Sequence, residues 1–194
     1  DISRLEAGAS IGAAARAQID GALNGMNDLL ECFNRVKWEE DRGRRNDNGV
    51  DSDRVVLYEP MGVVAAITPW NVPLYVNIGK VIAALLAGCT VVLKPAPDTP
   101  KMGSIMGELA IEAGFPPGVF NVVTSADPAM AGEMLVADPR VDVVSFTGST
   151  AVFQNIWKTI GENIANYRGY PRIVGETGGK DFIFVHPSAD FEAV

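Results

Sequence analysis

The chain has 194 residues, 47% of them hydrophobic, and a formal net charge of −8. A chain of this length forms one domain, at most one and a half, and can bury roughly 70% of its unfolded surface. The excess of acidic side chains argues against partners such as nucleic acid or anionic membranes. The longest apolar run, residues 81–93, is shorter than the roughly 20 residues of a spanning helix. Two cysteines cannot form a disulfide framework, so we expect a cytoplasmic protein, or a mitochondrial matrix protein if the source is eukaryotic.

Residues 1–38 are expected to form an N-terminal helical segment. An apolar stripe recurs there at spacings of three and four and predicts a core-facing helix at residues 10–36. The stripe consists of Ile19, Leu23, Met26, Leu30 and Phe33. The chain begins at Asp1 without a signal-like opening, so we expect that its native N-terminus is missing.

Residues 39–54 differ sharply from the segments on either side. They carry ten charged side chains and one aliphatic side chain, Val50. Such a segment has almost no apolar surface to bury. We predict a solvated loop or linker with no function of its own.

From residue 55 onward, short β-branched runs alternate with longer helical runs. The strands are apolar throughout, which is typical of parallel strands covered on both faces. This order predicts an α/β fold with a doubly wound, mainly parallel sheet and helices on both faces. Strands are predicted at residues 62–67, 89–93, 119–123, 141–146, 172–175 and 182–185, and helices at residues 75–87, 102–113, 128–137 and 149–167.

Ligands of such folds bind beyond the carboxyl ends of the strands, so the residues that follow each strand matter most. Asn71 follows the first strand and offers a fixed amide donor for an oxyanion; the alternative is that it caps the next helix. Lys94 follows the second strand and suits a nucleotide hydroxyl or phosphate; the alternative is a surface lysine.

Two later strands also end in polar loops. Gly148 and Ser149 lead into a helix and would admit a diphosphate at its N-terminus; the alternative is an ordinary capped turn. Glu176 stands before two glycines and Lys180 and is a general-base candidate. A P-loop is excluded, because Val174 stands where that motif needs glycine. No His/Cys cluster is present, so no metal site is predicted.

Together and in this order, the motifs at these strand ends resemble the aldehyde dehydrogenase superfamily. They are Thr68-Pro-Trp-Asn71, Lys94-Pro95, the turn at residues 114–119, Phe146-Thr-Gly-Ser149 and Glu176-Thr-Gly-Gly-Lys180. The resemblance implies a Rossmann-like NAD(P)-binding domain at residues 55–194. It implies an oxidoreductase that converts a small-molecule aldehyde to a carboxylic acid, and a homo-oligomer for the full-length enzyme.

Carried over by position, the resemblance makes Asn71 the oxyanion donor and Glu176 the general base. The coenzyme would be NAD or NADP, with NAD slightly favoured, and it would contact the strand ends and the loops that follow them. The implied contacts are Ile67, Thr68, Pro69, Trp70, Lys94, Pro95, Ala96, Pro97, Gly132, Phe146, Thr147, Gly148, Ser149, Val152, Thr177 and Gly178.

Three residues depart from the family pattern. Pro97 stands where many NAD-preferring members have a ribose-binding glutamate, so the choice between NAD and NADP stays open. Thr177 replaces a leucine, and Phe153 replaces a glycine. Residues 153–190 resemble the glutamate-γ-semialdehyde (pyrroline-5-carboxylate) dehydrogenase branch, whereas residues 55–150 resemble a general aldehyde dehydrogenase. We therefore hypothesise a chimera or a mosaic subfamily with a junction near residues 146–153.

The resemblance implies that the nucleophilic cysteine lies beyond Val194. Cys32 lies on a helix stripe and Cys89 opens a buried strand, so both are expected to be inert core thiols. We therefore expect no dehydrogenase turnover from this chain alone. The alternative function is a nucleotide-binding module or a pseudoenzyme fragment that performs no chemistry.

Overall fold

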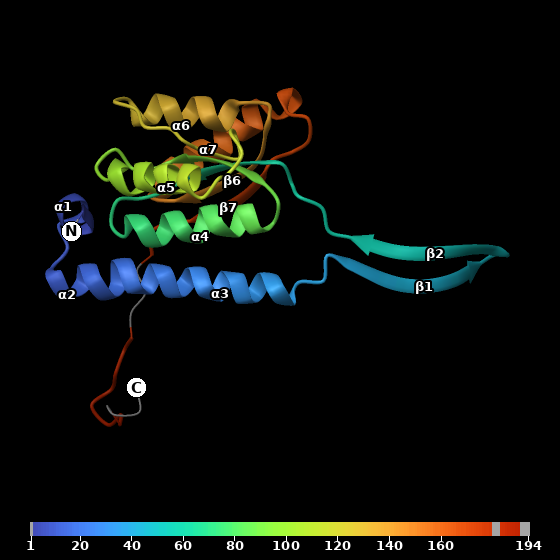
Figure 1. Ribbon diagram of the computed structural model, residues 1–194, viewed down its shortest axis with the longest axis horizontal. Coiled ribbons are helices and arrows are strands. Elements are labelled where there is room, and N and C mark those ends of the chain that lie inside the picture. The colour runs from blue at the N-terminus through green and yellow to red at the C-terminus, as the bar shows by residue number, and fades with distance from the viewer. Residues whose placement is uncertain (1, 180–182, 191–194) are drawn as a thin grey trace.

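The computed structural model describes residues 2–179 and 183–190 and contains a five-stranded parallel sheet with the order β5-β4-β3-β6-β7 (Figure 1). The strands are β3 (Val63–Ile67), β4 (Thr90–Lys94), β5 (Phe120–Val122), β6 (Val141–Thr147) and β7 (Arg172–Glu176). The chain runs outward from β3 to β5, returns to β6 beside β3, and continues outward to β7. This topology confirms the predicted doubly wound α/β fold and places the switch point between β3 and β6.

Helices cover both faces of the sheet. They are α4 (Pro73–Leu86) and α5 (Pro100–Glu112) on one face, and α6 (Pro128–Ala137) and α7 (Thr150–Glu162) on the other, with a short 3₁₀ turn, η2 (Ile164–Asn166), after α7. Side chains alternate along β3, so Val64 joins the core beneath α4 while Ala65 joins the core beneath α6 and α7. Within the described ranges, no helix is long and apolar enough to cross a membrane.

The sixth predicted strand is not formed. Residues 183–185 have no regular secondary structure, and Phe182 lies outside the described residues. A strand needs a hydrogen-bonded neighbour, and no described segment pairs with these residues. The other five strands and the four helices predicted after residue 55 are confirmed, with ends that differ by a few residues.

The N-terminal segment is helical, but it is divided into successive pieces. They are α1 (Ile2–Ala7), α2 (Ile11–Ala13), the π-helix η1 (Ala14–Asp20) and α3 (Gly21–Arg35). α3 lies along α4 (Figure 1). The predicted core-facing stripe is largely wrong, because Leu23, Leu30 and Phe33 are all exposed. Ala22 and Gly25 are turned toward α4 instead, since small residues let two helices approach closely and leave larger side chains outside.

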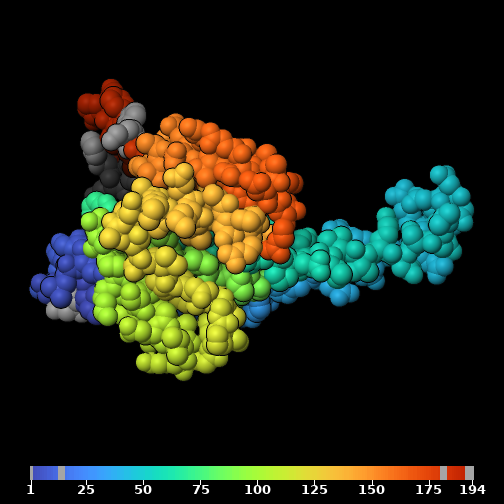
Figure 2. Space-filling model, turned by 90° about the horizontal axis from the view of Figure 1, so that it is seen from above, coloured from blue at the N-terminus to red at the C-terminus, as the bar shows by residue number. Residues whose placement is uncertain are grey.

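The prediction of a loop at residues 39–54 is wrong. The chain forms an antiparallel hairpin of β1 (Glu39–Asp47) and β2 (Val50–Leu57), which projects from the body (Figures 1 and 2). Its two-residue turn, Asn48-Gly49, has φ angles of 54° and 87°, as a tight hairpin turn requires. The charged side chains do not prevent the strands from pairing, because nearly all of them remain in solvent.

Candidate functional site

The carboxyl ends of four parallel strands meet at one edge of the sheet. Ile67 pairs with Lys94 on one side and with Phe146 on the other, and Thr147 pairs with Glu176. The four loops that carry the polar candidates therefore leave the sheet at the same edge. This arrangement is the one expected for a ligand site in a doubly wound fold.

Lys94 is buried at the end of β4, with 6% of its surface exposed. Burial lowers the pKa of its ammonium group. In the described ranges, no residue accepts a hydrogen bond from this group or forms an ion pair with it. Lys94 is thus largely covered, and it lines two cavities that open to solvent. Because Lys94 lines two cavities and lacks a partner among the described residues, the position suits a ligand with hydroxyl or anionic groups.

Two cavities meet at Lys94. The first, which we call the α6–α7 cavity, has a volume of about 320 Å³ and lies between Lys94 and helices α6 and α7. Its lining includes the predicted contacts Ile67, Gly132 and Val152, and its largely apolar walls suit a flat aromatic base. The second, the α5 cavity, has a volume of about 350 Å³ and includes the predicted contacts Pro95, Ala96 and Pro97.

The turn at Phe146–Ser149 is closely packed. The Ser149 hydroxyl caps α7 by accepting a hydrogen bond from the backbone N–H of Val152 at 3.3 Å. The capped turn is thus observed, and it leaves the α7 N-terminus facing the carboxyl edge, where a diphosphate would be favoured. A Cβ at Gly148 would clash with the Phe146 ring, so only glycine fits there.

Phe153, the departure from the family pattern, is accommodated by a second glycine. Its ring stacks on Phe146 with centroids 5.8 Å apart and lies against the backbone of Gly175, where a Cβ would clash with it. Gly175 immediately precedes Glu176 at the end of β7. Phe153 therefore helps to position the strand that carries the candidate base.

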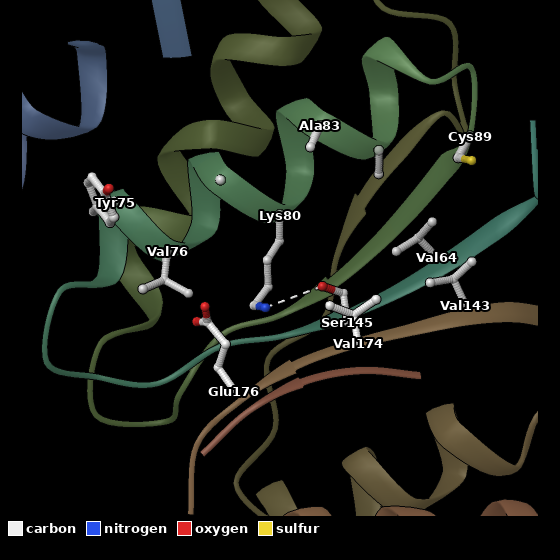
Figure 3. Close-up of a pocket in the computed structure, with 12 residues that line it drawn as sticks. Val64, Tyr75, Val76, Lys80, Ala83, Cys89, Val143, Ser145, Val174 and Glu176 are labelled. Carbon is white, nitrogen blue, oxygen red and sulfur yellow. Dashed lines mark hydrogen bonds between the residues drawn. The ribbon is translucent and has the colours of Figure 1, made fainter. Parts of the chain in front are cut away.

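Glu176 lines a third cavity, the α4 cavity, which has a volume of about 510 Å³ and lies between α4 and the sheet (Figure 3). The Thr147 hydroxyl donates a hydrogen bond to a Glu176 carboxylate oxygen at 3.1 Å. Lys80 reaches into the same cavity from α4 and donates to the Ser145 hydroxyl at 3.2 Å. Burial lowers the pKa of Lys80, and the negative charge of Glu176 partly opposes this shift.

Lys80 is a site residue that the sequence analysis missed. One sequence feature could have identified it. Lys80 is the one charged residue of the helix predicted at residues 75–87, and most other residues of that helix are apolar. A cation on such a helix needs a partner. Its partners Ser145 and Glu176 come from strands far along the chain, so spacing alone did not identify them.

Two side-chain hydrogen bonds hold the loop that carries Asn71. The Thr68 hydroxyl donates to the Asn77 side chain at 2.7 Å, and the Gln18 side-chain amide donates to the Asn71 carbonyl oxygen at 3.1 Å. The N-cap of α4 is Val72, with no side-chain cap, so the alternative that Asn71 caps this helix is not observed. Asn71 itself is exposed.

Several implied contacts do not line any of the three cavities. The Phe146 side chain is buried, and the Trp70 side chain is largely exposed. Lys180, the last residue of the base motif, lies outside the described residues. The other implied coenzyme contacts that line none of the three cavities are Thr68, Pro69, Thr147, Gly148, Ser149, Thr177 and Gly178.

Neither cysteine is placed to act at this edge. Cys89 is buried and lies just before the amino end of β4, at the end of the α4 cavity opposite Glu176 (Figure 3). Cys32 is exposed on α3, so the prediction that it is a core thiol is wrong. In the part of the chain that the structure describes, no group of three or more metal-ligating residues is present.

The fold is that of a Rossmann-like α/β domain, and Lys94 and Glu176, which line these cavities, lie at the carboxyl edge of its sheet. The family model described as "Aldehyde dehydrogenase family" matches residues 1–194, and the chain belongs to that family.

Three similar proteins illustrate the range of the family. The Escherichia coli succinate-semialdehyde dehydrogenase whose name specifies NADP(+) is 38% identical over 163 residues, which are 81% of this chain and 32% of that protein. The 1-pyrroline-5-carboxylate dehydrogenase 1 of Halalkalibacterium halodurans is 34% identical over 165 residues, covering 85% and 32%. The Mycobacterium tuberculosis aldehyde dehydrogenase, solved in complex with NAD+, superposes with a TM-score of 0.79 at 34% identity and covers 92% and 34%. The chain thus spans about a third of each relative.

Proposed function

We propose that the whole protein oxidises an aldehyde to a carboxylic acid with NAD or NADP, and that this chain supplies the coenzyme site and two of the catalytic groups. The observation that carries the proposal is the single sheet edge that joins the buried, unpartnered Lys94 to Glu176. Family membership supports it independently. The relatives reported above include proteins named for NADP(+) and solved with NAD+.

The described residues fit the adenosine half of such a coenzyme. The α6–α7 cavity would take the base, and Lys94 would donate to the ribose oxygens, which would give its ammonium group the acceptors that it lacks. Gly148 and the N-terminus of α7 would lie by the diphosphate. When bound, the nicotinamide coenzyme supplies the hydride acceptor of the reaction.

Glu176 is proposed as the general base, and Asn71 as the oxyanion donor. The Thr147 hydroxyl orients the Glu176 carboxylate, and the Lys80 side chain lines the same cavity. Glu176 would accept the proton of the nucleophile, release it to solvent, and then accept a proton from the hydrolytic water. The Asn71 side-chain amide would donate to the oxygen of the aldehyde as negative charge develops there.

We propose a small semialdehyde as the substrate class. The two curated relatives above are named for succinate semialdehyde and for pyrroline-5-carboxylate, and residues 153–190 resemble the second of these branches. The junction near residues 146–153 stays a hypothesis. Aligning residues 55–150 and 153–190 separately against the branches would test it, because one shared nearest branch would refute a mosaic origin.

The whole protein is proposed to form a homo-oligomer. A two-stranded hairpin is marginally stable by itself in water, yet β1 and β2 project from the body with Val50, Val55 and Leu57 exposed. A second copy would cover these side chains. Light scattering of the intact protein, with and without Val55→Ser, would test this by a change in mass.

A second candidate function is a nucleotide-binding module without turnover, and the remote positions of Cys32 and Cys89 favour it for this chain alone. Titration calorimetry with NAD and NADP tests the shared first step. Either coenzyme should bind saturably, and Lys94→Met should abolish binding while retaining the fold. If neither coenzyme binds, the coenzyme site proposed here is wrong.

A further inference from the structure

Helix α5 does not use the side chain of its own N-cap residue. Thr99 occupies the N-cap position but makes no capping hydrogen bond, and its buried hydroxyl oxygen has no partner among the described residues. A threonine there normally accepts from the backbone N–H of the second or third helical residue. In α5 these residues are Lys101 and Met102, because the helix begins at Pro100. Their N–H groups therefore need another acceptor.

The acceptor is a carboxylate from a remote part of the chain. Glu6, in α1, accepts hydrogen bonds from the backbone N–H groups of Lys101 and Met102, the second at 3.0 Å. A negative charge at this end of a helix is also favoured by the helix dipole. The N-terminal segment thus supplies the cap of α5, across 95 and 96 residues of sequence.

The first turn of α5 packs directly against the loop that follows β4. Gly103 is buried in that turn, and a Cβ there would lie only 3.1 Å from Cγ of Pro95. Pro95 directly follows Lys94, and the Thr99 N–H donates to the Ala96 carbonyl oxygen at 3.2 Å. The start of α5 and this loop therefore form one packed unit. A shift of the first turn would move Pro95 and, with it, the backbone at Lys94.

The position of α1 depends mainly on polar contacts. A helix of six residues is not stable by itself in water, and Leu5 of this helix is 84% exposed. The buried Ser3 hydroxyl donates to the Gln18 side chain, and Gln18 in turn donates to the Asn71 carbonyl oxygen. α1 is thus joined to the loop after β3 as well as to the start of α5.

We infer that Glu6 is a positioning residue for the coenzyme: by capping α5, it holds Pro95 and Lys94 in the arrangement that binds the adenosine ribose. This inference rests on the proposed function, in which Lys94 donates to the ribose oxygens. Without the cap, the first turn of α5 frays and the loop adopts arrangements that do not bind. The apparent affinity then falls with the fraction of binding-competent loops. By thermodynamic linkage, coenzyme binding stabilises the cap in return.

The test is titration calorimetry of the 194-residue chain with NAD and with NADP. Glu6→Ala should weaken the binding of both coenzymes about three- to tenfold, the factor that corresponds to the loss of a typical N-cap. Glu6→Gln keeps an oxygen acceptor of the same reach and should lose less affinity than Glu6→Ala. Leu5→Gln is the matched control and should bind like the unaltered chain, because Leu5 lies in the same helix with its side chain exposed.

Amide hydrogen exchange separates this positioning role from a general loss of stability. In the absence of coenzyme, exchange at Lys101 and Met102 should accelerate in Glu6→Ala and keep its rate in Leu5→Gln. Saturating NAD should slow exchange at both amides in the unaltered chain, because the coenzyme and the cap stabilise the same loop. Circular dichroism should show that each variant is folded. If Glu6→Ala does not fold, the comparison of Glu6→Gln with Leu5→Gln decides.

Unchanged affinities in Glu6→Ala, together with faster exchange at Lys101 and Met102, would overturn the inference and leave the proposed function standing. So would an equal loss of affinity in Glu6→Ala and Leu5→Gln. Absence of binding by the unaltered chain would overturn the proposed function, and the inference with it. The titration of the unaltered chain therefore distinguishes the two failures.

Discussion

The side-chain amide of Gln18, which is 4% exposed, donates a hydrogen bond to the backbone carbonyl oxygen of Asn71 across 53 residues of sequence. The Ser3 hydroxyl donates to the oxygen of the same Gln18 side chain. Gln18 lies in the π-helix η1, a rare element that often occurs near functional sites. The N-terminal segment thus fixes the loop that presents the candidate oxyanion donor.

Replacing Gln18 with alanine should loosen this loop. The change leaves the buried Ser3 hydroxyl and the Asn71 carbonyl oxygen without their partner, which should lower the free energy of unfolding by about 1–3 kcal/mol. Urea denaturation measures the loss, and amide hydrogen exchange should accelerate at residues 70–72. Unchanged exchange there, together with unchanged stability, would contradict a positioning role for Gln18.

Phe153 and Gly175 should depend on each other. Gly175→Ala places a methyl group against the Phe153 ring and should destabilise the fold by about 1–3 kcal/mol through overpacking. In a Phe153→Ala background the same change should cost much less, which a double-mutant cycle by urea denaturation would detect.

Gly161→Ala is the matched control for this cycle. Gly161 lies in α7 with no atom within 4 Å of an added Cβ, so alanine should raise the stability by up to about 1 kcal/mol. Equal destabilisation by Gly175→Ala in both backgrounds would show that the Phe153 ring is not the reason why alanine is unfavourable at position 175.

Lys80 and Glu176 should be electrostatically coupled. Burial lowers the pKa of Lys80 and Glu176 raises it, so Glu176→Gln should lower that pKa further. A titration followed by NMR of the Lys80 side chain measures the shift. Glu133→Gln, in the α6–α7 cavity, is the control and should leave the Lys80 pKa unchanged.

The lowered pKa of Lys80 should make the stability of the fold depend on pH. The pKa of Lys80 is lower in the folded chain than its usual value of 10.5, so between the two values the unfolded chain binds more protons. Lys80 should therefore make stability rise with pH through that window. In Lys80→Met this rise should be smaller in denaturation experiments; an unaltered pH dependence would argue that Lys80 is solvated normally.

The hairpin should depend on its turn. Gly49 has a φ of 87°, so Gly49→Ala should destabilise the hairpin by about 1–2 kcal/mol. Because β1 and β2 project from the body, amide exchange should accelerate at residues 39–57 and stay unchanged in the sheet. Loss of protection in β3 or β6 as well would mean that the hairpin supports the whole fold.

The sequence predicted the sheet and the residues at its edge because both depend on local patterns. Lys94 and Glu176 directly follow or end apolar strands, and parallel strands place such residues together. The hairpin was missed because the prediction for residues 39–54 rested on their charge alone, although Asn48-Gly49 is a typical hairpin turn. Gln18 and Lys80 were missed because their partners are distant in sequence, a property of tertiary structure that spacing does not reveal.

The most direct test of the central claim is to titrate the isotope-labelled chain with NADP and with NAD and to follow the backbone amides by NMR. A coenzyme site at the carboxyl edge predicts shifts at Lys94, Gly132, Gly148 and Val152, and none at the amino ends of the strands, at Gly62 and Gly118. Shifts at the amino ends, or no shifts with either coenzyme, would contradict a coenzyme site at this edge.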